Sequence, residues 1–549
     1  MQCPRVFSRN EIGAGVLVFM GALALYAINL DRPGHPDELH HVLAARGLLE
    51  TGEPRIADGI YWRGYLFTRL VAMSFSLFGE SIEAARIPSI LSIASTAALL
   101  FVWLARQTEI STAWLAAGLY ATSPFAVDIA QFSRFYAPQV LLVLAATICW
   151  YHAMTRAQHI GRRVLFLLIG GGAFAIAFEL AETTALAFVA AVVWIAIIVG
   201  VRVAKGAYTR GMPYFIALML TTFIICVGIL IFMWYSGVIY KFWEKYRYVQ
   251  EFNLAAKNKF WIYHFWYSLL YPSLWPMTTV FALIAIMRFR ELGMCLTIIF
   301  FSGFVLASFA GAKALRYIAF LHPFVFALWG IGLSSVFRKI YKWRAVIVSR
   351  LEEAYAAVNV PRTFARLSIF GAAAFVVLAN PFWVRTAALL ADIQIPPEKP
   401  SVYWNRAVEA LKPWLARVDV VVTSEELGTL YYLGRYDVAF NLSKRNELPR
   451  DQRVDFGIDP RTGRPVIGSV AALEKLWRCK RSGLFISPER RWGRRTSVFP
   501  KAAAFIEARM RRIELPAESR VRAYVWERAK AAGDPECASL PVPGRDGSS

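Results

Sequence analysis

Charged residues are scarce in this sequence, and their scarcity excludes an ordinary soluble protein. Only 18% of the 549 residues are charged, while 57% are hydrophobic; about a quarter of the residues in a soluble domain are charged. The apolar residues form blocks such as VLVFMGALALYAINL and ALAFVAAVVWIAIIVGV. Such blocks approach or exceed the roughly 20 residues that a helix needs to cross a bilayer. The sequence therefore predicts a polytopic α-helical membrane protein.

Cysteine is also rare, and no two cysteines have the spacing of metal ligands. The six lie at Cys3, Cys149, Cys226, Cys295, Cys479 and Cys537. Cys479 and Cys537 alone fall in the polar C-terminal tail, where a disulfide is possible and the sequence leaves their pairing open. A small-residue cleavage site is missing after the first apolar block, so we expect a retained first span and not a signal peptide.

Acidic residues are fewer than basic ones, 38 against 61, which gives a net charge of +23. In a soluble protein this excess would suggest nucleic-acid binding, but here the cations fall largely in short loops between apolar blocks. We therefore apply the positive-inside rule and expect no nucleic-acid partner. We count about eleven spans, at about 12–30, 83–104, 111–127, 136–153, 164–178, 183–201, 213–235, 266–287, 292–309, 316–335 and 367–389.

The order of the spans and the positions of the cations give the same orientation. With the N-terminus inside, every segment that falls inside is rich in Lys and Arg, including the long stretch 338–366. Outside lie 31–82, 128–135, 179–182, 236–265, 310–315 and the tail. The long first outer loop contains YLFTRLVAMSFSLFG, whose Leu66, Leu70, Met73 and Leu77 have helical spacing. We expect helices there that lie along the membrane surface.

Composition changes sharply near residue 390, so we divide the chain into a transmembrane domain, 1–389, and an outer domain, 390–549. The tail opens with the Pro-rich linker IPPEKP. VDVVVTS, YDVAF, SGLFIS and VRAYVWE are strand candidates, and EELGTLYYLG and AAAFIEARM are helix candidates. The tail thus reads as one small α/β domain, and the final PVPGRDGSS is typical of disorder.

The predicted orientation brings acids and cations from separate loops to the outer face. These candidate residues are Asp37 and Glu38 in HPDELHH, Arg134 and Tyr136 in SRFY, Glu179 and Glu182, His264, and Lys313, Arg316 and Tyr317. Sugar transfer from a lipid phosphate suits such a set, because a carboxylate can act as general base for the acceptor hydroxyl. Cations can stabilise the negative charge that develops on the leaving phosphate.

Each residue also has a purely structural interpretation. The Asp37–Glu38 pair could be solvated, the cations could anchor helix ends by snorkelling, and Glu182 could be an ordinary loop acid. His264 lies among Trp261, Tyr263 and Trp266 and fits an interfacial aromatic belt. The arrival of all these residues at one face favours a site.

Three segments make the chain resemble a known family. They are the DE pair with ARGLLETGEP and LFGESIEAARIPSIL, then SRFYAPQVLLVLA, and then AKALRYIAFLHPFVFALWG. Over about 12–335 the sequence resembles the dolichyl-phosphate-mannose protein mannosyltransferases and bacterial relatives, including the aminoarabinose transferases that modify lipid A. The resemblance implies a GT-C fold, a polyprenyl-phosphate-linked sugar as co-substrate and an inverting single displacement.

The resemblance also implies roles for individual residues. Asp37 would be the base or acceptor-orienting acid with Glu38 beside it, and Arg134, Lys313 and Arg316 would bind the donor phosphate. Tyr136 and Tyr317 would shape the cleft, and Glu182 stands where relatives often carry His or another polar residue. We add Glu182, His264 and Tyr61 as candidate cleft residues of our own. Some relatives bind a divalent metal near the phosphate and others need none; this sequence has no dedicated ligand set.

These observations lead to one functional hypothesis and its alternatives. We expect a monomeric enzyme of the bacterial inner membrane, with a cytoplasmic N-terminus and a periplasmic C-terminal domain, that glycosylates an envelope glycan or glycolipid. A protein acceptor is the alternative within the same class. A transporter or lipid flippase would require ionisable residues in mid-membrane, and the predicted spans have almost none. A receptor or scaffold would leave the outer-loop acids unexplained.

Overall fold

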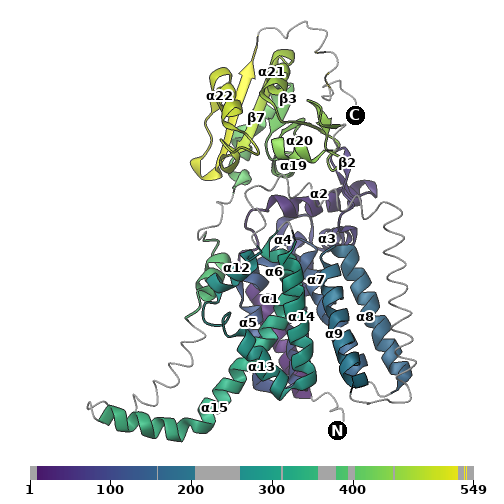
Figure 1. Ribbon diagram of the computed structural model, residues 1–549. Helices are drawn as coiled ribbons and strands as arrows, with labels where there is room; N and C mark the ends of the chain where they lie inside the picture. The colour runs from purple at the N-terminus through teal and green to yellow at the C-terminus, as the bar shows by residue number, and fades with distance from the viewer. Residues whose placement is uncertain are drawn as a thin grey trace. The chain divides into compact units, whose positions relative to one another are not determined.

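The computed structural model describes residues 9–156, 159–204, 260–310, 313–356, 379–393, 402–448 and 452–528, with Cys537 and Leu540. The chain divides into two compact units (Figure 1). Unit 1 comprises Met1–Ile28, Ser89–Gln131 and Phe135–Ile393; unit 2 comprises Asn29–Pro88, Phe132–Arg134 and Gln394–Ser549. The first outer loop is thus grouped with the C-terminal tail, unlike in the linear division at residue 389.

Unit 1 is helical, and six helices among the described residues are long and apolar enough to cross a membrane. They confirm six of the predicted spans. These helices are α4 (Ile82–Gln107), which begins in unit 2, α7 (Tyr136–Thr155), α8 (Ile160–Leu180), α9 (Thr184–Ala204), α14 (Arg290–Ser308), and η2 (Leu315–Leu321) joined to α15 (His322–Ala356). Helix α15 continues well past residue 335, where the apolar pattern ends.

Two other predicted spans are each divided into two helices. The segment 111–127 forms α5 (Ile110–Ala121) and α6 (Pro124–Ala130), because Ser123 accepts a hydrogen bond from Ala126 N and Pro124 starts the new helix. The segment 266–287 forms α12 (Ile262–Leu270) and α13 (Thr278–Arg288), and Pro272 and Pro276 lie between them.

The first predicted span is described in full and the last only in part. The first is α1 (Arg9–Tyr26), and the last described helix of the unit is α17 (Phe382–Leu390). The predicted span at 213–235, most of the one at 367–389, and most of the outer loop 236–265 lie outside the described residues. So do the predicted linker at 395–400 and the final residues 541–549.

Small residues let the helices of unit 1 approach closely. Helix α7 packs along α8, and α5 packs along α15 (Figure 1). A Cβ atom at Gly330 of α15 would lie 2.6 Å from the Ala116 Cβ of α5. Gly330 is thus required for this helix contact, since a real Cβ would force the two backbones apart.

Unit 2 contains a seven-stranded mixed sheet in the order β5–β6–β4–β3–β7–β9–β8. Strands β6, β4, β3 and β7 run parallel, and the other three pair antiparallel. Each strand and helix predicted in the tail is confirmed. The strands are β3 (Val420–Thr423), β4 (Val438–Phe440), β5 (Gly457–Ile458), β6 (Pro465–Ile467), β7 (Ser482–Pro488), β8 (Arg511–Ile513) and β9 (Val521–Glu527).

Helices cover both faces of this sheet, as alternating strands and helices predict. Helices α21 (Val470–Cys479) and α22 (Pro500–Arg509) bury Leu473 and Ile506 against one face. Helices α18 (Val408–Arg417) and α19 (Glu426–Leu433) pack against the other, where Leu411 is fully buried. Helix α20 (Leu442–Glu447) follows β4.

The first outer loop packs against this sheet domain. Helix α2 (Pro36–Thr51) lies beside α19 (Figure 1), and Arg46 lies over the Tyr431 ring at 5.4 Å. The hairpin of β1 (Arg55–Ile56) and β2 (Gly59–Ile60) contacts the turn between β5 and β6, where Asp58 N donates to Thr462 O at 3.0 Å. A Cβ at Gly59 would lie 2.5 Å from Gly463 N, so the hairpin tip needs glycine.

The amphipathic segment of the same loop is α3 (Tyr65–Phe78). It buries Phe67 and Val71 inside unit 2. The predicted stripe lies on its other side, where Met73 is 57% and Leu77 70% exposed. An exposed apolar stripe is what a helix at a membrane surface requires.

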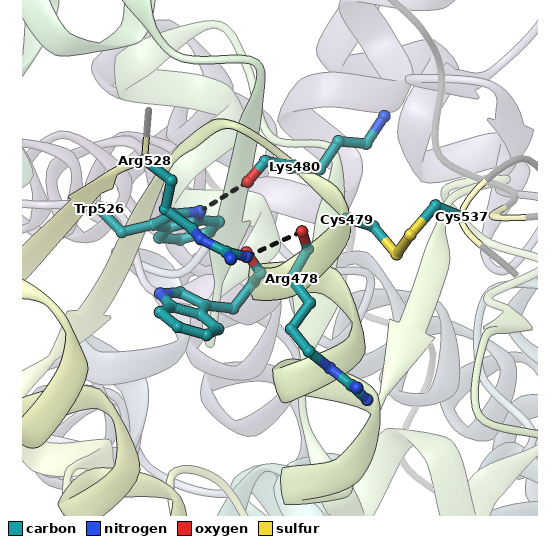
Figure 2. The surroundings of a disulfide bond; sticks show 7 residues. Arg478, Cys479, Lys480, Trp526, Arg528 and Cys537 are labelled. Atoms are coloured by element: carbon teal, nitrogen blue, oxygen red, sulfur yellow. Dashed lines mark hydrogen bonds between the residues drawn. A yellow bond between two sulfur atoms is a disulfide. The ribbon is translucent and has the colours of Figure 1, made fainter. Parts of the chain in front are cut away.

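A disulfide joins Cys479 at the end of α21 to Cys537, with their Cα atoms 5.2 Å apart (Figure 2). Beside it, Trp526 Nε1 donates to Lys480 O at 3.3 Å, and Arg528 Nη1 donates to Arg478 O at 2.9 Å. These bonds tie the end of β9 to the end of α21. The pairing that the sequence left open is thus present in the structure.

Candidate active site

Asp37 occupies the first turn of α2, where local sequence fixes the helix start. The His35 side chain accepts a hydrogen bond from Asp37 N at 3.1 Å, and Glu38 Oε2 accepts one from His35 N at 2.8 Å. This reciprocal capping, with Pro36 at the first helical position, explains why HPDE begins a helix. The Asp37 side chain is 33% exposed, so its carboxylate is fixed at the helix start and accessible to solvent.

Glu38 is buried and fully engaged. It forms a two-pronged ion pair with Arg86, at 2.9 and 2.8 Å, and accepts a hydrogen bond from Ser133 N at 2.8 Å. Burial alone would raise the pKa of Glu38, but Arg86 and the two backbone N–H donors lower it to about 2. Glu38 thus stays ionised and joins three parts of unit 2: α2, the start of α4 and residues 132–134.

Arg134 lies next to this ion pair and contacts Asp37 through the backbone. Its Nη1 donates to Asp37 O at 2.9 Å and to the Tyr61 hydroxyl at 3.2 Å. Tyr61 stacks on His40 with ring centroids 4.9 Å apart. Unit 2 therefore brings together four residues around the start of α2: Asp37, His40, Tyr61 and Arg134.

Unit 1 holds the second set of predicted residues. Lys313 Nζ donates to Ser308 O and Ala310 O at 2.8 and 2.7 Å, and it lies 5.8 Å from the centre of the Tyr263 ring. Burial lowers the pKa of Lys313. The Arg316 guanidinium is 5.6 Å from the Tyr317 ring centre.

Aromatic rings complete this second set. The rings of Tyr317 and Tyr136 lie 6.0 Å apart, and Tyr136 is buried. Unit 1 thus clusters Lys313 with Tyr263, and Arg316 with Tyr317 and Tyr136, at the start of η2. Cations that lie beside tyrosine rings are suited to an anionic group that carries an apolar tail.

Two of the predicted residues, Glu182 and His264, are exposed. Glu182 is exposed in the turn between α8 and α9. His264 is also exposed, and its Nδ1 accepts a hydrogen bond from Trp275 Nε1 at 2.8 Å. Trp261 and Trp275 both lie near its ring, as the aromatic-belt interpretation requires.

Sequence reasoning missed Arg86, Ser133 and His40. Arg86 carried a usable signal, because an arginine near the start of an apolar span needs an anionic partner. His40 lies within HPDELHH, but its stacking on Tyr61 depends on a residue 21 positions further on. Within the described residues, no group of three or more His, Cys, Asp or Glu side chains is placed to hold a metal ion.

Comparison with solved structures shows the fold. ArnT from Cupriavidus metallidurans matches in its apo state with a TM-score of 0.56 and 15% identity, over 93% of this chain and 98% of ArnT. The same protein bound to undecaprenyl phosphate matches with a TM-score of 0.56 and 14% identity, over 95% and 99% of the two chains.

A third similar structure is that of an oligosaccharyltransferase. The archaeal oligosaccharyltransferase AglB from Archaeoglobus fulgidus, in complex with an inhibitory peptide and a dolichol-phosphate, matches with a TM-score of 0.55 and 14% identity. The match covers 88% of this chain and 70% of AglB. The chain therefore has the GT-C fold that was expected, with a C-terminal sheet domain.

Sequence comparison points in the same direction. A family model described as dolichyl-phosphate-mannose-protein mannosyltransferase matches residues 64–234. No curated protein sequence matches the chain significantly. Together, the family model and the fold confirm the resemblance to glycosyltransferases that use polyprenyl-phosphate donors.

Proposed function

We propose that this chain transfers a sugar from a polyprenyl-phosphate donor to a hydroxyl of an envelope glycan or glycolipid, on the outer face of the inner membrane. The observation that carries the proposal is the start of α2. There a partly exposed carboxylate, Asp37, is fixed by helix capping and by the buried Glu38–Arg86 pair. The GT-C fold supplies the context, since a solved ArnT structure of this fold is bound to undecaprenyl phosphate.

The proposed reaction is a single displacement. The acceptor oxygen attacks the anomeric carbon and forms the new C–O bond, while the bond from that carbon to the phosphate oxygen breaks. The electron pair of the broken bond stays on the phosphate, and the hydroxyl proton passes to the Asp37 carboxylate. Attack opposite the leaving group inverts the anomeric centre.

The residues divide into three roles in this reaction. Asp37 is the general base, for which a carboxylate within hydrogen-bond reach of the hydroxyl suffices. Lys313 and Arg316 bind the donor phosphate and stabilise its growing charge, and Tyr136 and Tyr317 line that region. For Glu38 and Arg134 we propose roles other than the catalytic and phosphate-binding ones that the resemblance implies. Both are positioning residues, because their contacts hold α2 and the Asp37 backbone. A divalent metal at the phosphate remains compatible with these roles.

The disulfide supports the proposed orientation. Disulfides form and persist in oxidising compartments such as the bacterial periplasm, and they are rare in the cytosol. The Cys479–Cys537 pair thus favours a C-terminal domain outside the cytoplasmic membrane. The positive-inside count gives the same orientation independently.

A protein acceptor is the second candidate. The family model that matches residues 64–234 is described by mannosyl transfer to protein, and AglB of the same fold acts as an oligosaccharyltransferase. Either acceptor uses the same base and the same phosphate-binding residues.

One experiment tests the proposal and separates the two acceptors. Envelope lipids, glycans and proteins from cells with and without the gene are compared by mass spectrometry. A hexose or pentose mass lost from a lipid or glycan fraction supports the proposal, and a loss from peptides alone supports the protein acceptor. Unchanged glycosylation in every fraction, with lipid-linked sugar redistributed across the membrane, would instead support a flippase.

A further inference from the structure

The turn between α8 and α9, residues 181–183, is tied to α7 by one buried side chain. Gln139 of α7 is fully buried, and its Nε2 donates to the Thr183 and Thr184 hydroxyls, both at 2.9 Å. The Thr184 hydroxyl donates in turn to Ala177 O at 2.7 Å, in the last turn of α8. Three helices that lie side by side (Figure 1) are thus joined at this turn, which fixes its position.

The turn offers hydrogen-bonding groups that the described part of the chain does not use. Glu182 is exposed and forms no ion pair with any residue that the structure describes. Among the same residues, the Thr183 hydroxyl accepts from Gln139 and has no acceptor for its own proton. The buried Gln139 Oε1 also has no partner there, and unpaired buried polar groups are costly. A ligand with several hydroxyl groups would pair with these atoms.

This turn lies beside the residues that are proposed to bind the donor phosphate. Helix α9 packs against η2, which carries Arg316 and Tyr317. Gln139 is one helical turn from Tyr136 on α7, so their Cβ atoms are about 5–6 Å apart. The Tyr136 ring lies 6.0 Å from the Tyr317 ring. Contacts within unit 1 therefore connect the turn to the start of η2.

The negative charge of Glu182 decides which part of the donor fits here. A carboxylate repels a phosphate, but it accepts hydrogen bonds from hydroxyl groups, and hydrogen bonds to an ionised acceptor are roughly twice as strong as neutral ones. The donor sugar is bonded directly to the phosphate that Lys313 and Arg316 are proposed to bind, so it lies next to these cations. Glu182 is thus suited to the hydroxyl groups of the donor sugar and not to the phosphate.

We infer that Glu182 binds hydroxyl groups of the donor sugar, and that Gln139 holds the α8–α9 turn in the position that this contact needs. The inference rests on the function proposed above and adds to it a determinant of donor-sugar specificity. Glu182 touches the sugar and is a specificity-determining residue, whereas Gln139 acts through Glu182 and is a positioning residue. An acid that precedes a helix also stabilises the helix start, so the test separates the two roles.

The test compares donors with and without a sugar. The full-length protein, purified in detergent, is titrated with undecaprenyl phosphate and with undecaprenyl phosphates that carry mannose, glucose or xylose, and tryptophan fluorescence reports binding. Glu182→Ala should weaken binding of the sugar-linked form that the wild type binds best by about tenfold or more, since hydrogen bonds to charged groups contribute that much. Affinity for undecaprenyl phosphate itself should change by less than about twofold, because Glu182 does not contact the phosphate.

A double-mutant cycle tests the role of Gln139. Gln139→Leu removes both hydrogen bonds to the turn and should weaken binding of the sugar-linked form by roughly three- to tenfold, with undecaprenyl phosphate binding unchanged. In the Glu182→Ala background, Gln139→Leu should change affinity by no more than about twofold further, because a positioning residue acts only through the residue that it positions. Asp128→Ala is the matched control, since Asp128 is an exposed acid of α6, which also packs against η2.

Each outcome decides the inference. Selective loss of affinity for the sugar-linked form in Glu182→Ala, at a normal melting temperature, supports it. Equal loss for both ligands, no loss, or the same loss in Asp128→Ala overturns it, and a lower melting temperature with unchanged affinities assigns Glu182 to the start of α9 alone. Additive effects of the two substitutions overturn the role of Gln139. Wild-type protein that binds neither undecaprenyl phosphate nor a sugar-linked form would contradict the proposed function itself. If Gln139→Leu melts early, Glu182→Ala at its exposed position carries the test.

Discussion

Replacing Glu38 by Gln tests whether the Asp37 site is held by a buried ion pair. The ionised form is strongly favoured in the folded protein, because the pKa of Glu38 falls from 4.5 to about 2. The ionised Glu38 therefore adds about 3 kcal/mol to the free energy of unfolding, since one pKa unit represents about 1.36 kcal/mol. A buried Arg86 without its partner should lower the free energy of unfolding by a similar amount, since breaking a buried ion pair costs roughly 3–5 kcal/mol.

The expected loss is large enough to measure as a melting temperature. In a domain of about 150–250 residues, 1 kcal/mol shifts the melting temperature by roughly 2–4 °C. Glu38→Gln should therefore lower the melting temperature of the purified protein by about 6–12 °C at pH 7. Glu50→Gln, at an exposed position of the same helix, should change it by less than about 2 °C.

The pH dependence gives an independent check. A carboxylate whose folded-state pKa is depressed stabilises the protein above its unfolded pKa and loses that effect as pH falls toward the folded value. The difference between wild type and Glu38→Gln should thus be largest above pH 5 and shrink between pH 4.5 and 2. The double variant Glu38→Leu with Arg86→Met should recover part of the loss. Equal melting of Glu38→Gln and Glu50→Gln would refute the reasoning.

Two further predictions concern the donor and the orientation. Arg316→Gln should weaken binding of polyprenyl phosphate by about tenfold or more, measured by tryptophan fluorescence, while Arg162→Gln at an exposed position of α8 should not; equal affinities would remove Arg316 from the phosphate site. In a cysteine-free background, Lys412→Cys should react with a membrane-impermeant maleimide on intact spheroplasts, and Arg162→Cys should react only after lysis. The reverse labelling pattern would overturn the proposed orientation.

The fold could be predicted from the sequence where local patterns determine it. Long apolar blocks gave six of the spans, and alternating patterns gave the strands of the C-terminal sheet. Hydropathy alone overlooked the breaks at Ser123 and between α12 and α13. Both breaks carried local signals, a Ser-Pro pair and two prolines, that hydropathy does not weigh.

The site was less predictable because its contacts join distant parts of the chain. Asp37 was found from its place after the first span, but the role of Glu38 depends on Arg86, 48 residues later. The packing of the first outer loop on the C-terminal domain rests on contacts such as that between Asp58 and Arg464, 406 residues apart. No local period or spacing records such pairs.

The central claim is that Asp37 is the base for transfer from a polyprenyl-phosphate-linked sugar. Its most direct test is mass-spectrometric measurement of turnover by Asp37→Asn, with donor and envelope acceptor fractions supplied to the purified protein. The account predicts that transfer falls at least about 100-fold, while donor affinity and melting temperature stay near wild type. Near-normal transfer by Asp37→Asn would contradict it.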